Sequence, residues 1–373
     1  MIDYPSLLAH SETAVLRDPK DLGRCLVTGA AGFLGRNLVK GLLAQGCEVR
    51  AVVHRAPLAL RDAKLELVSA SVTDREAMRE ACSGVSTVFH SAAKIALLGG
   101  PSAADRYYGS AYETNVVGTR NLLAAARAAG AKRFVHTSSV DVCFDYGHQP
   151  AMTEAAPYSR SRRSVYQQTK ILAEQSVLEA NGLDGLATCA VRPGGIYGPE
   201  KNVMLDRFVE QLVRGLLLVR IGDGTSRWDV SEVSNLVHGE ILAALHLGHR
   251  EDGTPGIANG QAYFVTDGEP VNAFEFFRPI VEALGHRLPD RWIPGEAVLP
   301  FLLAMERVVL ALGLDEPELS PHAVRKLVHT HWGSIAKARR ELGYVPPKTV
   351  PMAVAECIPY CRKLAASLRA RHA

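Results

Sequence analysis

The sequence has no marked excess of charge of either sign. It contains 42 Lys and Arg and 39 Asp and Glu in 373 residues, a formal net charge of +3, and it has no long basic run. This balance leaves no surplus of cations to neutralise a phosphate backbone. We therefore expect no nucleic-acid partner.

Cysteine is present without the spacing of a disulfide framework or a zinc ribbon. The seven cysteines, an odd number, are scattered along the chain, which is typical of a reducing compartment. His329 and His331 have no Cys or acid at a suitable spacing to complete a metal-ligand set. We expect a cytoplasmic protein without a metal site.

Long apolar runs are absent as well. No uninterrupted stretch reaches the ~20 residues needed to span a bilayer; residues 297–312 come nearest, and Pro300, Glu306 and Arg307 interrupt them. We predict a mostly apolar helix there, packed in a core by default, or else covering a greasy substrate or lying peripherally against a membrane. Residues 1–21 lack the order of a signal peptide and are interpreted as a tail.

The chain alternates short apolar or β-branched runs with longer helical patterns, in an ordinary globular composition with 47% hydrophobic residues. This alternation predicts an α/β fold, a Rossmann-type doubly wound parallel sheet covered by helices. The expected strands are residues 24–28, 48–53, 65–69, 87–90, 133–137 and 187–192, and the expected helices are 33–45, one capped by Thr73 or Asp74, 113–129 and 164–180.

After Pro193 the alternation breaks into Gly-rich and Pro-rich pieces mixed with helices, which is typical of chain that builds a site. We assign residues 22–196 to a dinucleotide-binding Rossmann domain. Residues 231–267 return to this domain through a helix at 236–247 and a strand at 262–266. Residues 197–230 and 268–373 are expected to form a smaller, mixed substrate-binding domain.

A three-glycine turn, T-G-A-A-G-F-L-G at residues 28–35, separates the first expected strand from the first expected helix. Gly29 makes the tight turn, Gly32 lets phosphates approach the backbone, and Gly35 packs the helix against the strand, while the first helix amides face a pyrophosphate. Three glycines alone are a weak signal, but their place between strand and helix favours a dinucleotide site.

The second expected strand ends in V-V-H-R, with His54 and Arg55 where many NAD-binding folds carry an acid for the ribose 2′-hydroxyl. A guanidinium pairs with a 2′-phosphate, and the missing carboxylate removes a repulsion. NADP(H) is therefore favoured over NAD(H). The alternative is that Arg55 is solvated and stacks on the adenine of either cofactor.

Tyr166 and Lys170 are four residues apart, on one face of an expected helix. A nearby cation lowers the pKa of a phenol, so Tyr166 can exchange a proton with an alcohol or carbonyl oxygen. The fifth expected strand ends in T-S-S, at the sheet edge where such folds hold ligands. Ser139, or alternatively Ser138, can hydrogen-bond the reacting oxygen.

Six segments in this order resemble the extended short-chain dehydrogenase/reductase superfamily: residues 28–35, 88–93, 115–119, 137–139, 166–170 and 192–199. The resemblance implies that Ser139, Tyr166 and Lys170 form the catalytic group and that Asn115 supports a proton relay. It also implies that Ser71, Val72 and Ala92 line the adenine and ribose region and that Pro193 and Ile196 border the nicotinamide. The expected cofactor site joins these five to Gly29, Gly32, Phe33, Leu34, Gly35, His54, Arg55, Tyr166 and Lys170.

A narrower resemblance covers nearly the whole chain from residue 22 and is to the 3β-hydroxysteroid dehydrogenase family, including sterol-4-carboxylate 3-dehydrogenases. It rests on residues 235–239, 261–270 and 334–344. It implies a homodimeric NAD(P)-dependent oxidoreductase that interconverts a secondary alcohol and a ketone on a hydrophobic substrate, at the 3β-hydroxyl of a steroid or sterol. His54 departs from the acid of many family members that use NAD.

Three other functions remain as rivals. An NADPH-dependent reductase of long-chain 2-alkyl-3-oxoacids fits the same architecture, and a nucleotide-sugar epimerase or dehydratase is disfavoured by the hydrophobic carboxyl-terminal region. A dinucleotide-sensing regulator has no need of Tyr166 and Lys170 together.

Overall fold

A single sheet of seven parallel strands forms the centre of the molecule. The computed structural model describes residues 18–96, 105–161, 164–250, 252–312, 314 and 319–372. Within them the strand order is β11-β7-β5-β4-β1-β2-β3, and every neighbouring pair is parallel. The strands are β1 (Cys25–Thr28), β2 (Val49–Val53), β3 (Leu65–Ser69), β4 (Thr87–His90), β5 (Arg133–Thr137), β7 (Ala187–Arg192) and β11 (Gln261–Phe264). The expected doubly wound sheet is confirmed, and its order reverses between β1 and β4, where such sheets bind ligands.

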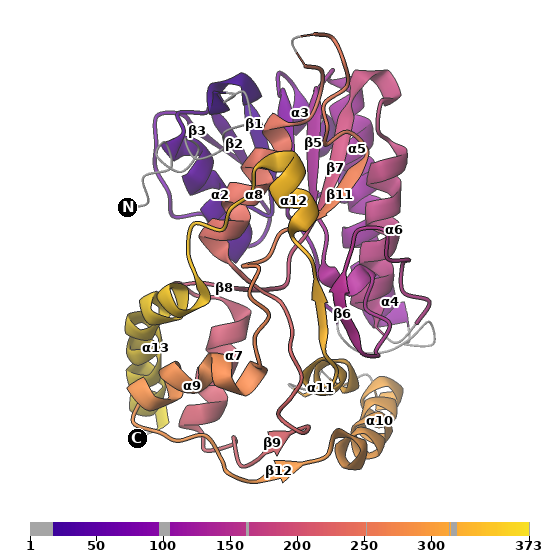
Figure 1. The fold of residues 1–373 in the computed structure, drawn as a ribbon. Helices are drawn as coiled ribbons and strands as arrows, with labels where there is room; N and C mark the ends of the chain where they lie inside the picture. The colour runs from indigo at the N-terminus through magenta and orange to yellow at the C-terminus, as the bar shows by residue number, and fades with distance from the viewer. Residues whose placement is uncertain are drawn as a thin grey trace.

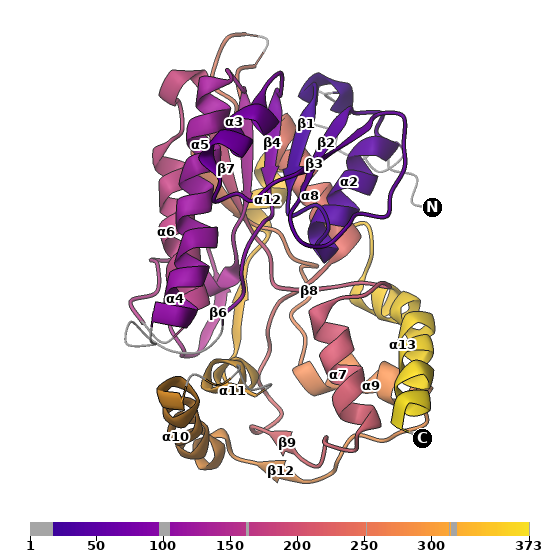
Figure 2. The ribbon, with the colours of Figure 1, turned by 180° about the vertical axis from the view of Figure 1, so that it is seen from behind.

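Helices cover both faces of this sheet (Figures 1 and 2). One face carries α2 (Phe33–Ala44), α8 (Val233–Leu245) and α12 (Ala336–Leu342), and the other carries α3 (Arg75–Cys82), α5 (Gly118–Ala128) and α6 (Val165–Glu179). Because both faces are covered, the central strands are buried along their whole length.

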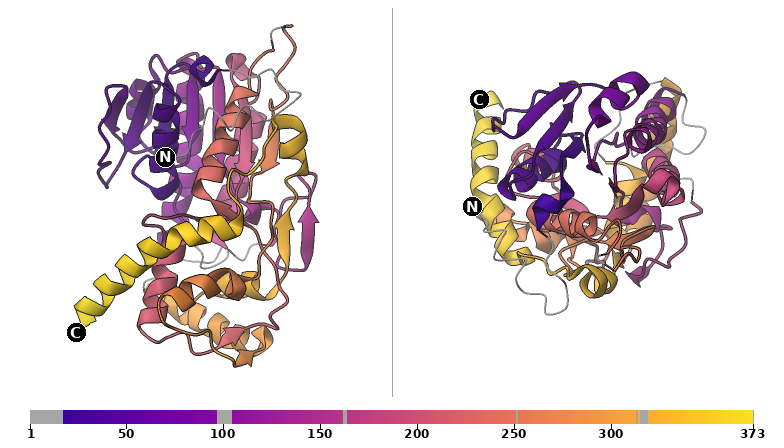
Figure 3. Two further views of the ribbon diagram at one scale, coloured as in Figure 1. Left: turned by 60° about the vertical axis from the view of Figure 1, so that its left-hand side comes forward. Right: turned by 90° about the horizontal axis from the view of Figure 1, so that it is seen from above.

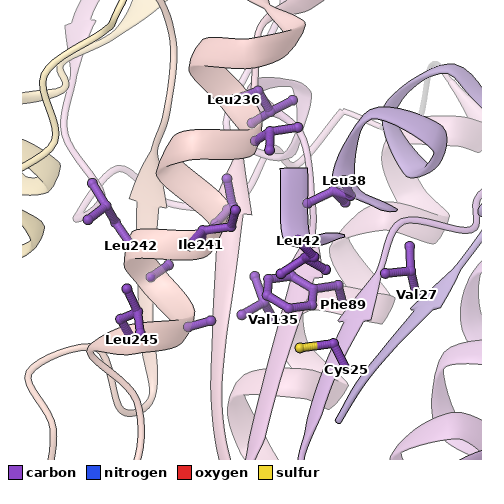
Figure 4. Packing of buried hydrophobic residues seen from close by; sticks show 14 of the residues in the cluster. Cys25, Val27, Leu38, Leu42, Phe89, Val135, Leu236, Ile241, Leu242 and Leu245 are labelled. Atoms are coloured by element: carbon purple, nitrogen blue, oxygen red, sulfur yellow. The ribbon is translucent and has the colours of Figure 1, made fainter. Parts of the chain in front are cut away.

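The main hydrophobic core lies between the sheet and the pair α2 and α8. Figure 4 shows Leu236 and Ile241 of α8 facing Leu38 and Leu42 of α2, above Phe89 of β4. Every residue of α8 is buried, so this helix has no solvent-facing side. Each fully buried Leu or Ile contributes about 1.5–3 kcal/mol, and the return of residues 231–267 to the sheet therefore stabilises the first domain strongly.

One helix begins at an expected cap, a second begins at a cap that the sequence analysis did not name, and a third differs from its expected bounds. Asp74 caps α3 by accepting hydrogen bonds from the next backbone amides, and Ser164 caps α6. The helix expected at 113–129 begins earlier, as α4 (Asp105–Tyr112), and reaches α5 through a π-helical turn, η3 (Glu113–Val117). The turn interrupts the 3.6-residue period on which the prediction rested.

The second unit comprises α7 (Val203–Val213), α9 (Ala273–Ala283), α10 (Gly295–Leu312), α11 (Pro321–Val328) and α13 (Val350–His372), with two short ladders. The ladders pair β8 (Gly195–Tyr197) with β10 (Val230–Glu232), and β9 (Arg220–Ile221) with β12 (Trp292–Ile293). Helices α7, α9 and α13 share a core, and α13 projects from the body of the molecule (Figure 3).

The chain crosses between the two parts more than once. A ladder of β6 (Gln149–Met152) and β13 (His331–Gly333) joins them. Residues 335–344, which the sequence analysis assigned to the substrate-binding domain, pack on the sheet, because Ile335, Ala338, Leu342 and Tyr344 belong to the core of α2 and α8.

The apolar helix α10 is not a core helix, so the default expectation for residues 297–312 is wrong. Its buried residues are Gly295, Leu302 and Val309, whereas Phe301 is 70% and Leu312 67% exposed. Its Leu310 packs against a small cluster formed by Ala96, Ala111 and Val165 with Tyr108. Among the described residues no helix is both long and apolar enough to cross a bilayer.

The amino-terminal tail expected at residues 1–21 falls mostly on residues 1–17, which lie outside the described ranges. Residues Pro19–Leu22 form a short 3-10 helix, η2, whose Leu22 is buried in the main core. All seven cysteines are buried and unpaired.

Candidate active site

The glycine turn brings the backbone of β1 and the start of α2 into very close contact. Gly29 has a φ of +67°, a conformation that side chains disfavour, and a Cβ there would lie 2.8 Å from the backbone of Ala92. A Cβ on Gly35 would lie 2.2 Å from the Gly29 carbonyl oxygen. These two positions therefore require glycine for steric reasons.

The start of α2 is open to an anion. Its N-cap residue, Gly32, provides no side-chain hydrogen bond, so the first amides of the helix have no intrahelical acceptor. Together with the positive end of the helix dipole, these amides form a site for a pyrophosphate. The described backbone therefore fits the phosphates of a dinucleotide.

A cleft of about 490 Å³ extends from this turn along the carboxyl ends of β1, β2, β3 and β4. Half of the predicted cofactor contacts line it: Gly29, Gly32, His54, Arg55, Ser71, Val72 and Ala92. The end of β2 carries no carboxylate, and His54 and Arg55 are exposed at the rim. The adenosine half of a dinucleotide thus has a formed cleft.

The other predicted cofactor contacts lie outside the lining of this cleft. Leu34 is buried in the main core, and Phe33 is half-buried, with its ring next to Gly198. The Pro193 carbonyl accepts a hydrogen bond from the Val140 amide at 2.9 Å, and Ile196 lies on β8. The nicotinamide contacts of Pro193 and Ile196 stay predictions.

Ser139 and Tyr166 are close together at the end of β5. Ser139 is 7% exposed and caps the 3-10 turn η4 (Val140–Val142) by accepting a hydrogen bond from the Asp141 amide at 3.2 Å. A hydrogen bond with the Ser139 hydroxyl acts to lower the pKa of Tyr166. The alternative, Ser138, has a buried hydroxyl with no partner among the described residues.

The pKa of Tyr166 differs from the expectation. Burial, reinforced by the negative charge of Asp141, raises it above the ordinary value of a phenol. The predicted lowering by Lys170 is wrong for this structure, because the Lys170 ammonium points to the strand. It donates to the Thr137 carbonyl oxygen at 2.5 Å and lies 3.3 Å from His136 Nε2.

Lys170 is surrounded by other ionisable groups. Burial lowers its pKa to about 8, against the charges of Glu174 and Glu240. Glu240 of α8 accepts a hydrogen bond from the Thr137 hydroxyl at 2.7 Å. Thr137 thus contacts an ammonium from α6 and a carboxyl from α8, on opposite faces of the sheet.

Asn115 sits on the π-helical turn and holds two segments together. Its side chain accepts from the Lys94 amide at 2.7 Å, and donates to the Lys94 carbonyl and to the Thr169 hydroxyl, both at 2.9 Å. It thereby fixes the loop after β4 against the helix of Tyr166. A role in a proton relay stays a prediction.

Sequence reasoning missed several residues that shape this site. Gln167 donates to the carbonyls of Asp141 and Phe144, both at 2.6 Å, and so fastens the loop after β5 to α6. Asp141 and Glu240 are buried acids whose positions depend on residues far away in the sequence. Gln167 could have been noticed as a polar residue next to Tyr166, but no local pattern marks the two acids.

Comparison with known proteins decides the family. The profile of the 3-beta hydroxysteroid dehydrogenase/isomerase family matches residues 26–299. A Mycobacterium tuberculosis protein named 3 beta-hydroxysteroid dehydrogenase/Delta 5-->4-isomerase is 44% identical over 340 residues, covering 91% of this chain and 90% of the relative. The chain belongs to the 3-beta hydroxysteroid dehydrogenase/isomerase family. It is therefore an oxidoreductase that acts on CH–OH groups, and its family implies a nicotinamide dinucleotide cofactor.

A further sequence relative supports the family assignment, and a solved structure supports the fold. A 3-beta-hydroxysteroid dehydrogenase of Mycolicibacterium neoaurum is 42% identical, covering 91% of this chain and 92% of the relative. Among solved structures, MoeE5 in complex with UDP-glucose and NAD aligns with a TM-score of 0.68 at 25% identity, covering 91% of this chain and 99% of MoeE5. The fold is thus shared with enzymes of sugar nucleotides.

Gly35→Ala should weaken dinucleotide binding about tenfold or more, about 1.4 kcal/mol, because its methyl group forces Gly29 away from the phosphate site. Isothermal titration calorimetry with NADP and with NAD measures the dissociation constants. Gly147→Ala is the matched control, since a Cβ there meets nothing within 4 Å. An unchanged dissociation constant for Gly35→Ala would contradict this account of the turn.

Glu240 should make stability depend on pH. Burial raises its pKa to about 7, so its contribution to stability is full below its unfolded pKa and is lost as the pH rises through about 7. Glu240→Gln removes this titration. The free energy of unfolding of the variant, relative to the wild type, should therefore rise by about 1–3 kcal/mol from about pH 5 to about pH 8.

Urea denaturation across this pH range measures the effect. Glu76→Gln is the control, because the Glu76 side chain is 71% exposed in its pair with Arg79, and the stability difference should stay nearly constant with pH. A constant difference for Glu240→Gln as well would show that Glu240 does not titrate in this way.

Proposed function

We propose that this chain interconverts the 3β-hydroxyl and the 3-ketone of a steroid or sterol, with Ser139, Tyr166 and Lys170 as the catalytic group and NADP(H) as the favoured cofactor. The observation that carries the proposal is the 44% identity over nine-tenths of the chain to a 3β-hydroxysteroid dehydrogenase. The meeting of Ser139 and Tyr166 at the ligand edge of the sheet supports it.

A nicotinamide dinucleotide, when bound, would supply the ring carbon that exchanges hydride with the carbinol carbon. The glycine turn and the open start of α2 would hold its phosphates. Ser139 donates a hydrogen bond that orients the substrate oxygen, and Tyr166 exchanges the hydroxyl proton with that oxygen. In oxidation the phenolate of Tyr166 takes the proton; in reduction the phenol gives it.

The environment of Tyr166 influences whether oxidation or reduction is favoured. Because burial and Asp141 raise the pKa of Tyr166, the phenol keeps its proton at neutral pH in the protein without cofactor. A protonated phenol is suited to donate a proton to a carbonyl. Oxidation requires more positive charge near the phenol, and Lys170 is one helical turn away to provide it when it binds the cofactor ribose. We expect oxidation to be favoured by alkaline pH and reduction by neutral pH.

A hydrophobic substrate fits the surroundings of Tyr166. The Ala96 carbonyl accepts a hydrogen bond from the Tyr166 amide at 2.9 Å, and Ala96 and Val165 pack with Leu310 of the apolar helix α10. At ~25 cal/mol per Å² of buried apolar surface, a sterol skeleton can bind such a region with few polar contacts.

A second candidate is the reduction of 2-alkyl-3-oxoacids. A Stenotrophomonas maltophilia protein named 2-alkyl-3-oxoalkanoate reductase is 33% identical, covering 88% of this chain and 96% of the relative. The end of β2, with Arg55 and without an acid, agrees with an NADPH-dependent reductase. The lower identity ranks this candidate second.

Tyr166→Phe should reduce oxidation of a 3β-hydroxysteroid by a factor of about 10² to 10⁴ while leaving dinucleotide binding within about twofold, because the variant loses the proton-transfer group only. Cofactor absorbance measures turnover, and calorimetry measures binding. The panel contains 3β-hydroxysteroids, long-chain 3-oxoacids and UDP-glucose. Tyr360→Phe, on α13, is the matched control and should keep its activity.

Retention of most activity by Tyr166→Phe would refute the mechanism. Turnover of the 3-oxoacids without turnover of the steroids would replace the proposed substrate by that of the second candidate.

Arg55→Ala should lower kcat/KM with NADP about tenfold and leave kcat/KM with NAD within about twofold, because the guanidinium pairs with the 2′-phosphate alone. Arg61→Ala, which removes an exposed arginine nearby, is the control and should leave the ratio unchanged. A wild type that prefers NAD tenfold would instead favour a solvated Arg55.

The homodimer implied by the family resemblance stays a prediction.

We also propose that α10 contacts a membrane surface peripherally, as suits an enzyme that acts on a lipid substrate. The exposed side of α10 carries Phe301, Val308 and Leu312, which lie on one stripe of the helix, beside Arg307. Such a stripe, with a cation at its edge, is suited to the headgroup region of a bilayer.

Co-sedimentation with vesicles of phosphatidylcholine and phosphatidylglycerol tests the membrane contact. Phe301→Ser combined with Val308→Ser should reduce the bound fraction about tenfold, whereas Leu67→Ser, at an exposed position on β3, should leave it unchanged. Equal binding of all three proteins would exclude α10 as the contact.

A further inference from the structure

An ion pair with a buried carboxylate and a partly buried ammonium connects the second unit to the loop that follows β5. Lys326 Nζ of α11 lies 2.6 Å from Asp141 Oδ1, and His322 Nε2 lies 3.4 Å from Asp141 Oδ2. The Asp141 side chain is 5% exposed and that of His322 is 3% exposed. Two side chains from one helix thus enclose a single carboxylate.

This contact is held in place on the side of α11. Ser320 caps the helix by accepting a hydrogen bond from the Ala323 amide at 3.2 Å. The Tyr146 hydroxyl lies 2.7 Å from His322 Nδ1, so His322 is in contact with both Asp141 and Tyr146. The orientation of His322 is therefore fixed at both ring nitrogens.

Asp141 is equally fixed on the side of the catalytic group. Its amide donates to the Ser139 hydroxyl at 3.2 Å, and its carbonyl accepts from the side chain of Gln167, the residue after Tyr166, at 2.6 Å. One residue thus contacts Ser139, the helix of Tyr166, and α11.

The charges of this cluster oppose one another. Burial alone would raise the pKa of Asp141, but Lys326 and His322 hold it well below its usual range, so Asp141 is a carboxylate at neutral pH. Its charge raises the pKa of Tyr166. The ammonium of Lys326, 2.6 Å from Asp141 Oδ1, has the opposite sign and offsets part of that charge by Coulomb's law.

Other ionisable groups surround the helix of Tyr166. Lys170 and Glu174 share α6, and Tyr112, Glu113, Arg120 and Arg192 stand on the elements packed against it. Among the described residues, Asp141 is the charged group that raises the pKa of Tyr166.

We propose that Asp141, Lys326 and His322 form a positioning unit through which the second unit sets the loop of Ser139 and the charge around Tyr166. The inference rests on the proposed function of Tyr166. Lys326 and His322 act through Asp141 and are positioning residues, and none of the three transfers the substrate proton. With α11 seated on the loop, Lys326 offsets part of the charge of Asp141, so the phenol ionises for oxidation at a lower pH than it would beside an unpaired carboxylate.

The pH profile of kcat for oxidation of a 3β-hydroxysteroid by the holoenzyme tests this inference. Lys326→Met leaves Asp141 uncompensated and should move the alkaline rise of kcat upward by about one pH unit. Asp141→Asn removes the negative charge and leaves the Lys326 ammonium without its anionic partner, so it should move the alkaline rise of kcat downward by about one pH unit. The double variant should return to within about half a unit of the wild type.

Opposite shifts that cancel are the signature of charge compensation. A merely structural contact predicts that both single variants lose kcat at every pH and that the double variant is no better; that result would overturn the inference. Lys326→Arg keeps the charge and is the matched control, with a wild-type profile expected. Lys326→Gln repeats the neutral replacement should Lys326→Met not fold.

A titration without turnover provides a second readout. The ultraviolet absorbance of tyrosinate, compared between each protein and the same protein with Tyr166→Phe, isolates the ionisation of this residue. It should begin at lower pH in Asp141→Asn than in the wild type, and an unchanged onset would count against the inference. If the wild type shows no oxidation that depends on Tyr166, the proposed function is refuted. If it shows such oxidation but the variants leave the pH profile of kcat unshifted, only this inference is overturned.

Discussion

The carboxyl end of β5 contacts one ionisable side chain from each face of the sheet, and the rest of the site depends on this arrangement. The Thr137 carbonyl accepts a hydrogen bond from Lys170 and the Thr137 hydroxyl donates one to Glu240. A buried polar or charged group is costly unless it is hydrogen-bonded, so a shift of either helix along the strand would leave a buried ionisable group without its partner. The position of α6, and with it that of Tyr166, follows from this constraint.

Much of the fold could be predicted because the signals are local. The seven strands of the central sheet were placed to within one or two residues, since each depends on neighbours in the sequence. The glycine turn was found for the same reason, as was Asp74, one of two cap candidates. The short strands of the small ladders were not predicted. The π-helical turn at residues 113–117 and the exposure of α10 were missed, because a hydrophobic pattern does not say which partner covers it.

The candidate site was predicted as a set of residues but not as an electrostatic system. Tyr166 and Lys170 share a helix, so their spacing suggested a cation that lowers the pKa of the phenol. In the folded chain Lys170 points to β5, while Asp141, held by a helix that comes much later in the sequence, sets the charge near the phenol. Burial and contacts between distant segments determine the ionisation of the phenol, and a spacing of four residues predicts neither.

The placement of α12 has a consequence for how the protein is made. The core that contains Leu22 and the first strands also contains Tyr344, which arrives after the whole of α10 and α11. During translation, part of the surface of α8 therefore stays uncovered until Tyr344 has left the ribosome. Until then this apolar surface is available to chaperones or to other nascent chains. Folding of the first domain is therefore completed only after α10 and α11 have been synthesised, although its first strands precede both helices.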